Sequence, residues 1–431
     1  MVDKYEVSAS RSVAFDLLRS VTAKNKSFDD AMVLHDGFRR LPVRDRAFVR
    51  KIVTTALRRL GQIDALISNC LKRALPKKAI VVHDILRIAV TEIIFLKFPP
   101  HAAVDSAVTL VGSRNFPKLM GLTNAVLRRL ATEGHELLNS FPETLNVPNW
   151  MLESWKTAYG EQYTQEIIEA LLKEPPLDIT VKNNKESWAE KLDAETLLLG
   201  SLRKRFDGRI EEMPGFSEGE WWVQDAAASI PVSLLGDVSG MQVLDVCAAP
   251  GGKTAQLAAA GAIVTAVDRS GGRLKRLEKN LIRLGLQANI VTADATEWIC
   301  NKKFDAVLLD PPCSATGTIR RHPDILYSKT TNDLAKLVRL QENLLVQSSQ
   351  LVKPGGKLIF CTCSLQIEEG ESQIERFLSV SKSFKRETIK DNEVGGHSLF
   401  INEQGDLRTL PFYLKELGGI DGFFASRLIR D

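Results

Sequence analysis

Short apolar runs in the second half of the chain alternate with stretches of helical periodicity, and this alternation restricts the possible folds more than any other feature. The intervening stretches, such as 272–284 and 334–351, are long enough for helices. Strands that alternate with helices form a mainly parallel sheet with helices on both faces. The predicted buried strands are 241–246, 262–267, 289–292, 304–309 and 357–361.

Two other segments precede this α/β region. The chain of 431 residues is about three times the length of an average domain, so more than one domain is expected. Over residues 1–140 apolar side chains recur with the 3.6-residue period of helices. From 141 to 220 prolines punctuate helical and strand-like pieces. We therefore predict an all-α bundle over 1–140, a small α+β region over 141–220 and an α/β domain over 221–431.

The small net charge of +4 hides an uneven distribution along the chain. Residues 1–140 contain 23 lysines and arginines against 13 aspartates and glutamates, a net charge of +10, whereas the remainder contains 34 against 40. A basic module beside an acidic one suggests contact with a polyanion, most often nucleic acid. A solvated helical bundle with basic faces would have the same charge, so both interpretations stay open here.

Several protein classes are excluded by simple features of the sequence. The longest stretch without a charged side chain covers 14 residues, from Thr254 to Val267, which is too short for a membrane-spanning helix. The charged start, Met1 to Glu6, leads into no apolar segment, so no secretion signal is expected and the compartment is predicted to be the cytoplasm. Six cysteines in so long a chain do not form a disulfide scaffold.

A glycine-rich turn follows the first predicted strand of the α/β domain. Such a turn lets backbone N–H groups approach a ligand, and the next helix N-terminus favours an anion. A Walker A loop needs glycine at Cys247, and the dinucleotide fingerprint G-x-G-x-x-G is absent. S-adenosylmethionine remains as the predicted ligand, against the alternative of a turn that merely connects strand and helix. The predicted cofactor-binding residues of this turn are Cys247, Ala248, Ala249, Pro250, Gly251, Gly252 and Lys253.

Acidic residues stand at the ends of the next two strands. Asp268 follows the second strand, where a carboxylate can accept hydrogen bonds from the hydroxyls of a ribose. Asp294 follows the third strand and could bind an adenine amino group. Each aspartate taken singly could equally be a helix cap. Because the ends of parallel strands share one edge of a sheet, both are predicted to contribute to the cofactor site.

The fourth and fifth strands deliver cysteines to the same edge. Asp310-Pro-Pro-Cys313 follows the fourth strand, and Thr362-Cys363-Ser364 follows the fifth. The cysteines could instead be buried core residues or metal ligands. One C-x-C pair with one distant cysteine and no closely spaced histidine is, however, a poor zinc pattern. Nucleophilic catalysis fits better, because a thiolate beside a methyl donor can attack an electron-poor ring carbon. We expect the side chain of Cys361 to point to the opposite face of the sheet from that of Cys363.

These motifs together resemble the RNA cytosine-C5 methyltransferases of the class I S-adenosylmethionine fold. Within them the chain is similar to the bacterial 16S ribosomal RNA enzymes with an N-terminal NusB-like domain, the RsmB, Sun or Fmu type. The resemblance spans nearly the whole chain, although the middle region matches loosely. It rests on the residues from Ala248 to Lys253, on the two cysteine motifs, and on the stretches 99–104, 122–128, 224–229, 319–325 and 421–424.

The resemblance implies a role for each matched residue. Cys363 would attack C6 of the target cytosine, Cys313 would assist loss of the C5 proton and release of the enzyme, and Asp310 would contact the base edge and border the methyl donor. Cys361 is the alternative nucleophile, and Cys363 is preferred because the Thr-Cys-Ser order of the family matches there. Arg320 and its neighbours would lie beside the site and grip the RNA backbone, or form a solvated loop.

The resemblance also implies a fold and a partner. The methyltransferase domain would be Rossmann-like, with three α/β/α layers and a mostly parallel seven-stranded sheet whose one antiparallel strand is sought at 422–429. The substrate would be 16S rRNA, free or in an assembling small subunit, and the protein would act as a monomer without a metal ion or a membrane. The same chemistry on tRNA or another RNA is an alternative. A non-catalytic RNA-binding or antitermination factor is an alternative of another class.

Overall fold

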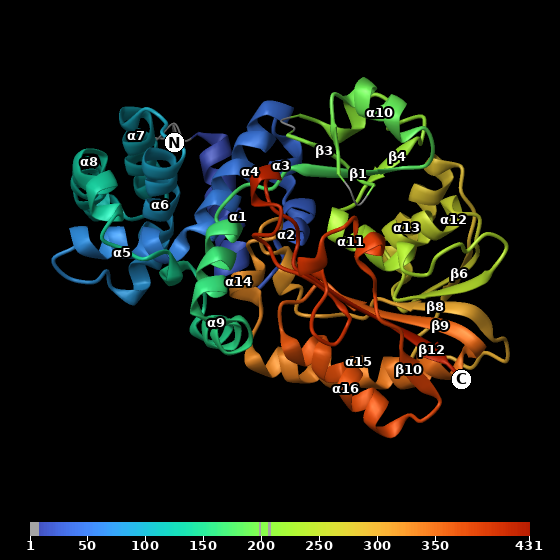
Figure 1. Cartoon of the computed structure of the whole chain (residues 1–431). Coiled ribbons are helices and arrows are strands. Elements are labelled where there is room, and N and C mark those ends of the chain that lie inside the picture. The colour runs from blue at the N-terminus through green and yellow to red at the C-terminus, as the bar shows by residue number, and fades with distance from the viewer. Residues whose placement is uncertain (1–7, 198–199, 206–207) are drawn as a thin grey trace. The chain divides into compact units, whose positions relative to one another are not determined.

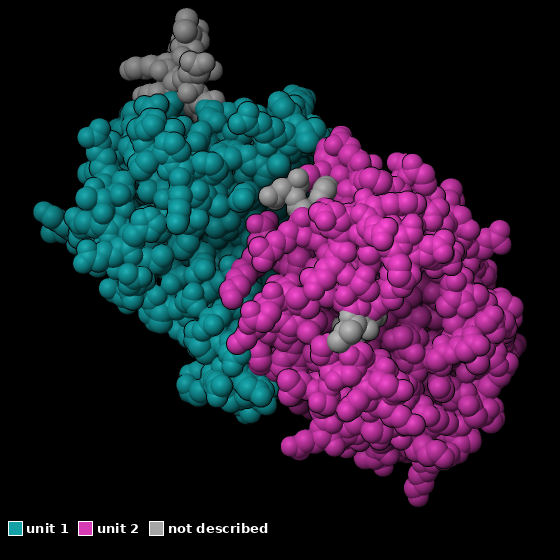
Figure 2. Space-filling view, turned by 45° about the horizontal axis from the view of Figure 1, so that its top comes forward, with its two compact units in different colours: residues 1–172, 319–329 teal, residues 173–318, 330–431 magenta. Residues whose placement is uncertain are grey.

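The computed structural model describes residues 8–197, 200–205 and 208–431, and it divides into two compact units (Figure 2). Unit 1 consists of residues 1–172 and 319–329, and unit 2 of 173–318 and 330–431. The expectation about a secretion signal concerns Met1 to Glu6, which lie outside the described residues. Within the described ranges, no helix combines the length and apolarity that a membrane crossing requires.

Unit 1 is helical, as its 3.6-residue periodicity predicts (Figure 1). The apolar stripe from Val49 to Leu60 is buried, and its part from Val49 to Leu57 lies inside one core together with stripes from the neighbouring helices. Burial of these stripes, rather than helix propensity, supplies most of the stability of such short helices. The helices are α1 (Ala9–Thr22), α2 (Phe28–Leu34), α3 (Asp36–Arg40), α4 (Val43–Arg58), α5 (Leu60–Cys70), α6 (Ile80–Val90), α7 (Pro100–Ser113), α8 (Met120–Leu138), α9 (Asn149–Leu171) and α14 (Ile325–Ser328).

A segment from the second half of the chain completes unit 1. Residues 319–329, which include α14, follow the Cys313 motif in sequence but fold with the N-terminal helices. Asp324 Oδ2 accepts a hydrogen bond from Phe28 N at 3.1 Å, and Tyr327 donates its hydroxyl to the Leu57 carbonyl at 2.9 Å. The expectation that Arg320 grips RNA is wrong, because its side chain is only 1% exposed. Its carbonyl accepts a hydrogen bond from Arg58 at 2.8 Å.

Replacing Arg320 should therefore affect stability. We expect Arg320→Ala to lower the free energy of unfolding of unit 1 by about 2 kcal/mol, because it removes a large buried side chain. Thermal unfolding followed by circular dichroism measures the change. His322→Ala is the matched control, because that neighbouring side chain is exposed. Equal melting temperatures for Arg320→Ala and His322→Ala would contradict the assignment of Arg320 to the core.

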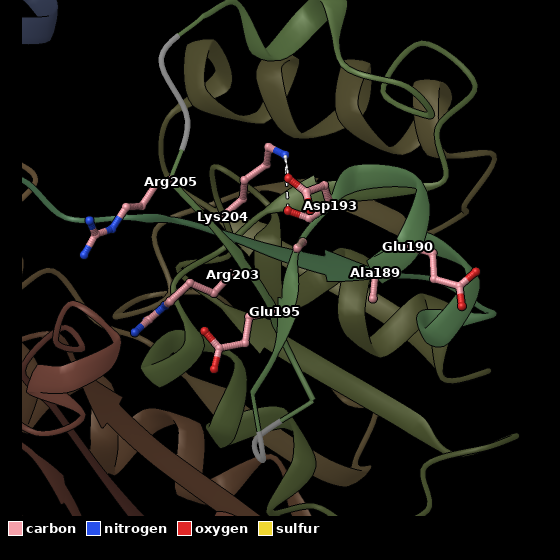
Figure 3. A pocket seen from close by; sticks show the side chains of 8 residues that line it. Ala189, Glu190, Asp193, Glu195, Arg203, Lys204 and Arg205 are labelled. Atoms are coloured by element: carbon pink, nitrogen blue, oxygen red, sulfur yellow. Dashed lines mark hydrogen bonds and ion pairs between the residues drawn. The ribbon is translucent and has the colours of Figure 1, made fainter.

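Unit 2 begins with a small antiparallel sheet of order β2-β3-β1-β4 that packs against α10 (Lys185–Leu192). A bidentate ion pair between Asp178 and Arg203, with both distances 2.7 Å, joins two of its strands. An open hollow beside this sheet is lined by side chains of both charges, among them Glu190 and Lys204, and contains no predicted site residue (Figure 3). The strands are β1 (Leu177–Val181), β2 (Glu195–Thr196), β3 (Leu202–Lys204) and β4 (Trp221–Val223).

The larger sheet of unit 2 has the predicted α/β order. Its strands follow the order β10-β12-β9-β8-β5-β6-β7, and β11 pairs with β12. The five strands β5 to β9 pair in parallel, whereas β12 runs antiparallel to β9 at the predicted position. The bounds are β5 (Gln242–Val246), β6 (Ile263–Asp268), β7 (Asn289–Thr292), β8 (Phe304–Leu309), β9 (Val352–Thr362), β10 (Phe384–Arg386), β11 (Leu407–Thr409) and β12 (Phe423–Arg430).

Helices cover both faces of this sheet and give the three layers that the resemblance implied (Figure 1). Alternating strand residues separate the two cores: Val243 packs with α11 and α12, while Leu244 packs with α15 and α16. The helix α13 lies on the same side as α12. The bounds are α11 (Ala226–Ser233), α12 (Gly252–Ala259), α13 (Gly271–Leu284), α15 (Thr331–Gln350) and α16 (Glu371–Val380).

Candidate active site

The glycine-rich turn lies between β5 and α12, as the sequence predicts. Gly251 has a φ of 106°, and a Cβ there would lie 2.7 Å from the Leu277 side chain, so the turn requires glycine. Asp268, at the end of β6, accepts a hydrogen bond from Ala249 N at 3.2 Å. Arg273 of α13 pairs with Asp268 at 3.4 Å and also donates to the Ala249 carbonyl. The turn is therefore held by the neighbouring strand and helix.

A pocket opens beside this turn, and it collects three of the predicted cofactor-binding residues. Cys247, Asp268 and Asp294 line it together with two arginines and several apolar side chains. Asp294 also accepts hydrogen bonds from the backbone and hydroxyl of Thr296, and these bonds lower its pKa, so it caps the local turn as well. The remaining lining residues are Val267, Arg269, Arg273, Ala293, Ala295, Pro312, Leu340 and Leu344.

A partly buried ion pair connects the glycine-rich turn to the loop after β8. Lys253 Nζ lies 2.7 Å from Asp310 Oδ2 and 5.2 Å from the centre of the Phe423 ring. Burial alone would lower the pKa of Lys253, but Asp310 and the nearby Cys361 and Cys363 outweigh it and keep the pKa above its usual value. Lys253 is thus a fixed positive charge next to the cysteines, rather than only a part of the cofactor turn.

Two thiols meet at the ends of β8 and β9. The Sγ atoms of Cys313 and Cys363 are 3.5 Å apart, and both side chains are partly exposed. The contact with Cys363 and burial raise the pKa of Cys313 well above its usual value, and the charges of Glu369 and Asp310 add to this effect. Cys313 is therefore a neutral thiol at ordinary pH. The structure brings together the two cysteines that the sequence predicts to act together.

Cys361 differs from both of these cysteines because it is fully buried inside β9. Burial raises its pKa well above the usual value, which makes it a poor nucleophile. The expectation that it points to the opposite face from Cys363 is wrong. Both side chains pack against the same apolar core, because residues two apart in a strand share a face.

The sequence reasoning missed the contacts that support the cysteine loops. Gly317 and Gly422 pack backbone to backbone, and a Cβ on Gly317 would lie 1.8 Å from the Gly422 carbonyl oxygen. Gly317 N donates to the Cys363 carbonyl at 3.0 Å. Glu369, which is fully buried, accepts hydrogen bonds from residues next to both cysteines. No local pattern predicts the approach of Gly317 to Gly422 or the contact of Ser314 with Glu369, because these partners lie more than 50 residues apart along the chain.

Asp245 lies on β5 behind the glycine-rich turn and is only 1% exposed. Its Oδ2 accepts a hydrogen bond from the Thr254 hydroxyl at 2.6 Å. Burial raises the pKa of Asp245 to about 7, despite the opposing effect of that hydrogen bond. The carboxyl group therefore carries a proton over much of the acidic pH range.

Comparisons with known proteins were made for the whole chain. Residues 232–429 match a family model described as 16S rRNA methyltransferase RsmB/F, and residues 8–132 match the NusB family. The protein named ribosomal RNA small subunit methyltransferase B from Klebsiella pneumoniae is 36% identical over 97% of this chain and 98% of its own length. The protein of the same name from Escherichia coli is 33% identical over the same shares. The crystal structure of PH0851 shares the fold, with a TM-score of 0.76 and 24% identity, covering 99% of this chain and 100% of that one.

The raised pKa of Asp245 predicts a specific dependence of stability on pH. In the unfolded chain the group loses its proton near pH 4, whereas in the folded chain it does so near pH 7. The free energy of unfolding should therefore fall as pH rises between these values. The variant Asp245→Asn has no carboxyl group to ionise, so its free energy of unfolding should not show this fall. In urea titrations, the free energy of unfolding of Asp245→Asn minus that of the wild type should therefore rise by about 2 kcal/mol from pH 5 to pH 8.

Asp305 provides a matched control for this experiment. A hydrogen bond from Lys353 lowers the pKa of Asp305, so the group is ionised in both states above pH 5. The stability difference between Asp305→Asn and the wild type should thus be the same at both pH values. A constant difference for Asp245→Asn as well would mean that Asp245 ionises normally in the folded protein.

Proposed function

The chain belongs to the 16S rRNA methyltransferase RsmB/F family, and from this premise we propose that it methylates C5 of a cytosine in 16S rRNA with S-adenosylmethionine. The single observation that carries the proposal is the pair of thiols, 3.5 Å apart, in a methyltransferase fold whose pocket is lined by Asp268 and Asp294. A methyltransferase that acts on a nucleophilic nitrogen or oxygen has no need of two thiols, whereas C5 of cytosine must first be activated by addition to the ring.

The residues of the pocket fit S-adenosylmethionine. Asp268 and Asp294 offer carboxylates to a ribose and to an adenine amino group, and apolar side chains such as Leu340 offer a surface to the adenine ring. Residues 247–253 would hold the methionine part near the N-terminus of α12. When bound, S-adenosylmethionine supplies the methyl group. Cys247 stays a neutral thiol there, because burial raises its pKa to about 12.

Cys363 is the proposed nucleophile. It is partly exposed, whereas Cys361 is buried, and the positive charge of Lys253 lies near it. Its Sγ forms a bond to C6 of the cytosine, and the electron pair of the C5–C6 double bond moves toward C5. That carbon then becomes nucleophilic enough to accept the methyl group.

Cys313 and Asp310 complete the proposed site. Asp310 would contact the base edge while it remains paired with Lys253. After methylation, the C5 proton would pass to solvent with the assistance of Cys313, which restores the C5–C6 double bond and expels the Cys363 thiolate. Because both ring carbons must be reached, the target cytosine has to leave its stack, so it should lie in a loop or in unpaired RNA.

The two cysteines should give different phenotypes. With labelled S-adenosylmethionine and total RNA that lacks 5-methylcytosine, the wild type should produce 5-methylcytosine in the small-subunit RNA. Cys363→Ala should abolish the label, because no bond to C6 forms. Cys313→Ala should accumulate a protein–RNA adduct that resists denaturant, because release is blocked. Nucleoside analysis and denaturing gels measure both outcomes.

Cys361→Ala is the matched control for this pair, and it should retain methyl transfer with no adduct. Label in tRNA would preserve the mechanism and change the substrate. Tight RNA binding without any methyl transfer would favour a non-catalytic RNA-binding factor. Loss of transfer in Cys361→Ala but not in Cys363→Ala would exchange the roles of these two cysteines.

The basic NusB domain is proposed to add RNA affinity through phosphate contacts. Lys77 and Lys78 are exposed in the segment before α6, and the double variant Lys77→Gln/Lys78→Gln should reduce the slope of log affinity against log salt by up to about 2. Filter binding between low and physiological salt measures the slope. The double variant Lys382→Gln/Lys415→Gln, at exposed positions of unit 2, should change it less. Equal slopes for both variants would contradict a special role of the helical domain.

A further inference from the structure

Glu369 is a fully buried carboxylate that the proposed chemistry does not use. It lies six residues after Cys363, in the short turn before α16. Buried carboxylates are costly unless their oxygens are fully hydrogen-bonded, so one that persists in a core calls for a physical explanation. The hydrogen bonds that Glu369 accepts supply it.

The carboxylate of Glu369 binds the residue that follows each of the two cysteines. Ser314, next to Cys313, donates its backbone N–H to Oε1 at 2.9 Å and its hydroxyl to Oε2 at 2.5 Å. Ser364, next to Cys363, donates its hydroxyl to Oε2 at 2.6 Å. One carboxylate thus bridges the loop after β8 and the loop after β9, next to the pair of thiols.

A third element joins this network from the other side. Gln341 of α15 donates its side-chain amide to Glu369 Oε1 at 2.9 Å and to the Pro312 carbonyl at 2.9 Å. The backbone on each side of Cys313 is therefore held by a hydrogen bond: the Pro312 carbonyl binds Gln341, and the Ser314 N–H binds Glu369. The backbone carbonyl of Glu369 also accepts the Thr362 hydroxyl at 3.1 Å, which ties the same turn to the residue before Cys363.

The chemistry of a carboxylate suits this position better than that of an amide. Two oxygens accept about four hydrogen bonds at once, and here two hydroxyls, a backbone N–H and an amide point at them. A glutamine has a single acceptor oxygen, and its NH₂ group, which is itself a donor, would face some of these donors without accepting a hydrogen bond from them. The negative charge also lies close enough to Cys313 to favour the neutral form of that thiol.

We propose that Glu369 is a positioning residue that sets the separation and orientation of Cys313 and Cys363. The inference rests on the proposed function for its consequence in catalysis, but the geometry that it predicts concerns the two thiols alone. A displacement of about 1 Å in a reacting group can lower a rate about 100-fold, so a residue that fixes both loops should affect turnover strongly.

The first test measures the pair of thiols without RNA. Phenylarsine oxide binds two neighbouring thiols by forming two As–S bonds with loss of one water, and both cysteines are partly exposed to it. Wild-type protein should bind it tightly, and Cys313→Ala should not. Glu369→Gln should weaken binding about 10-fold or more, and Ser314→Ala, which removes one donor to the carboxylate, should weaken it less. Intrinsic fluorescence and the melting temperature establish that each variant is folded.

Asp406→Asn is the matched control. Asp406 is also a fully buried carboxylate of unit 2, but it pairs with Arg386 at 3.3 Å, and among the described residues it accepts no hydrogen bond from either cysteine loop. It should bind the arsenical as the wild type does. Unchanged arsenical binding in folded Glu369→Gln and Ser314→Ala would overturn the proposal, and so would an equal loss in Asp406→Asn.

The second test connects the geometry to turnover. In the methyl-transfer assay, Glu369→Gln should lower kcat about 100-fold with little change in KM for RNA, and it should accumulate the adduct as Cys313→Ala does. A purely structural defect would reduce adduct and product together and would contradict the inference. If the arsenical test succeeds while the wild type transfers no methyl group, the proposed function fails and the positioning role of Glu369 remains.

Discussion

The pairing of β5, β8 and β9 as adjacent parallel strands is the constraint on which the candidate site depends. Asp245 pairs with Leu308, and Leu309 pairs with Phe360, so these strands are in register at their carboxyl ends. Three loops that are far apart in sequence therefore emerge side by side: the glycine-rich turn, the Asp310 loop and the Cys363 loop. Hydrogen bonds between parallel strands have no alternative partners in the dry interior, which keeps this register fixed.

Charged side chains lie close to both thiols. Lys253 brings a positive charge to the side of Cys363, while Asp310 and Glu369 place negative charges near Cys313. In a poorly solvated site such charges act strongly, because little water screens them. Together with burial and the contact with Cys363, these carboxylates keep Cys313 a neutral thiol.

The course of the chain connects this chemistry to the helical unit. Immediately after the Cys313 loop and Gly317, the chain leaves unit 2, contributes residues 319–329 to unit 1 and returns at Thr330, the N-cap of α15. Asp324 and Tyr327 anchor that segment among the N-terminal helices. The loop that carries one thiol is thus covalently continuous with a segment whose position is determined by the NusB-like helices.

Local sequence patterns determined much of this molecule: the strands of the α/β domain, the helical periodicity of residues 1–140, the glycine-rich turn, and the placement of Asp268, Asp310, Cys313 and Cys363 at strand ends. These features depend on residues close together in the chain, so spacing reveals them. Only the tertiary structure decided the burial of Arg320, the approach of Gly317 to Gly422, the pairing of Lys253 with Asp310 and the bridge made by Glu369. Each of these depends on which strands become neighbours, and a single sequence has no periodic signal for contacts between residues 50 or more positions apart.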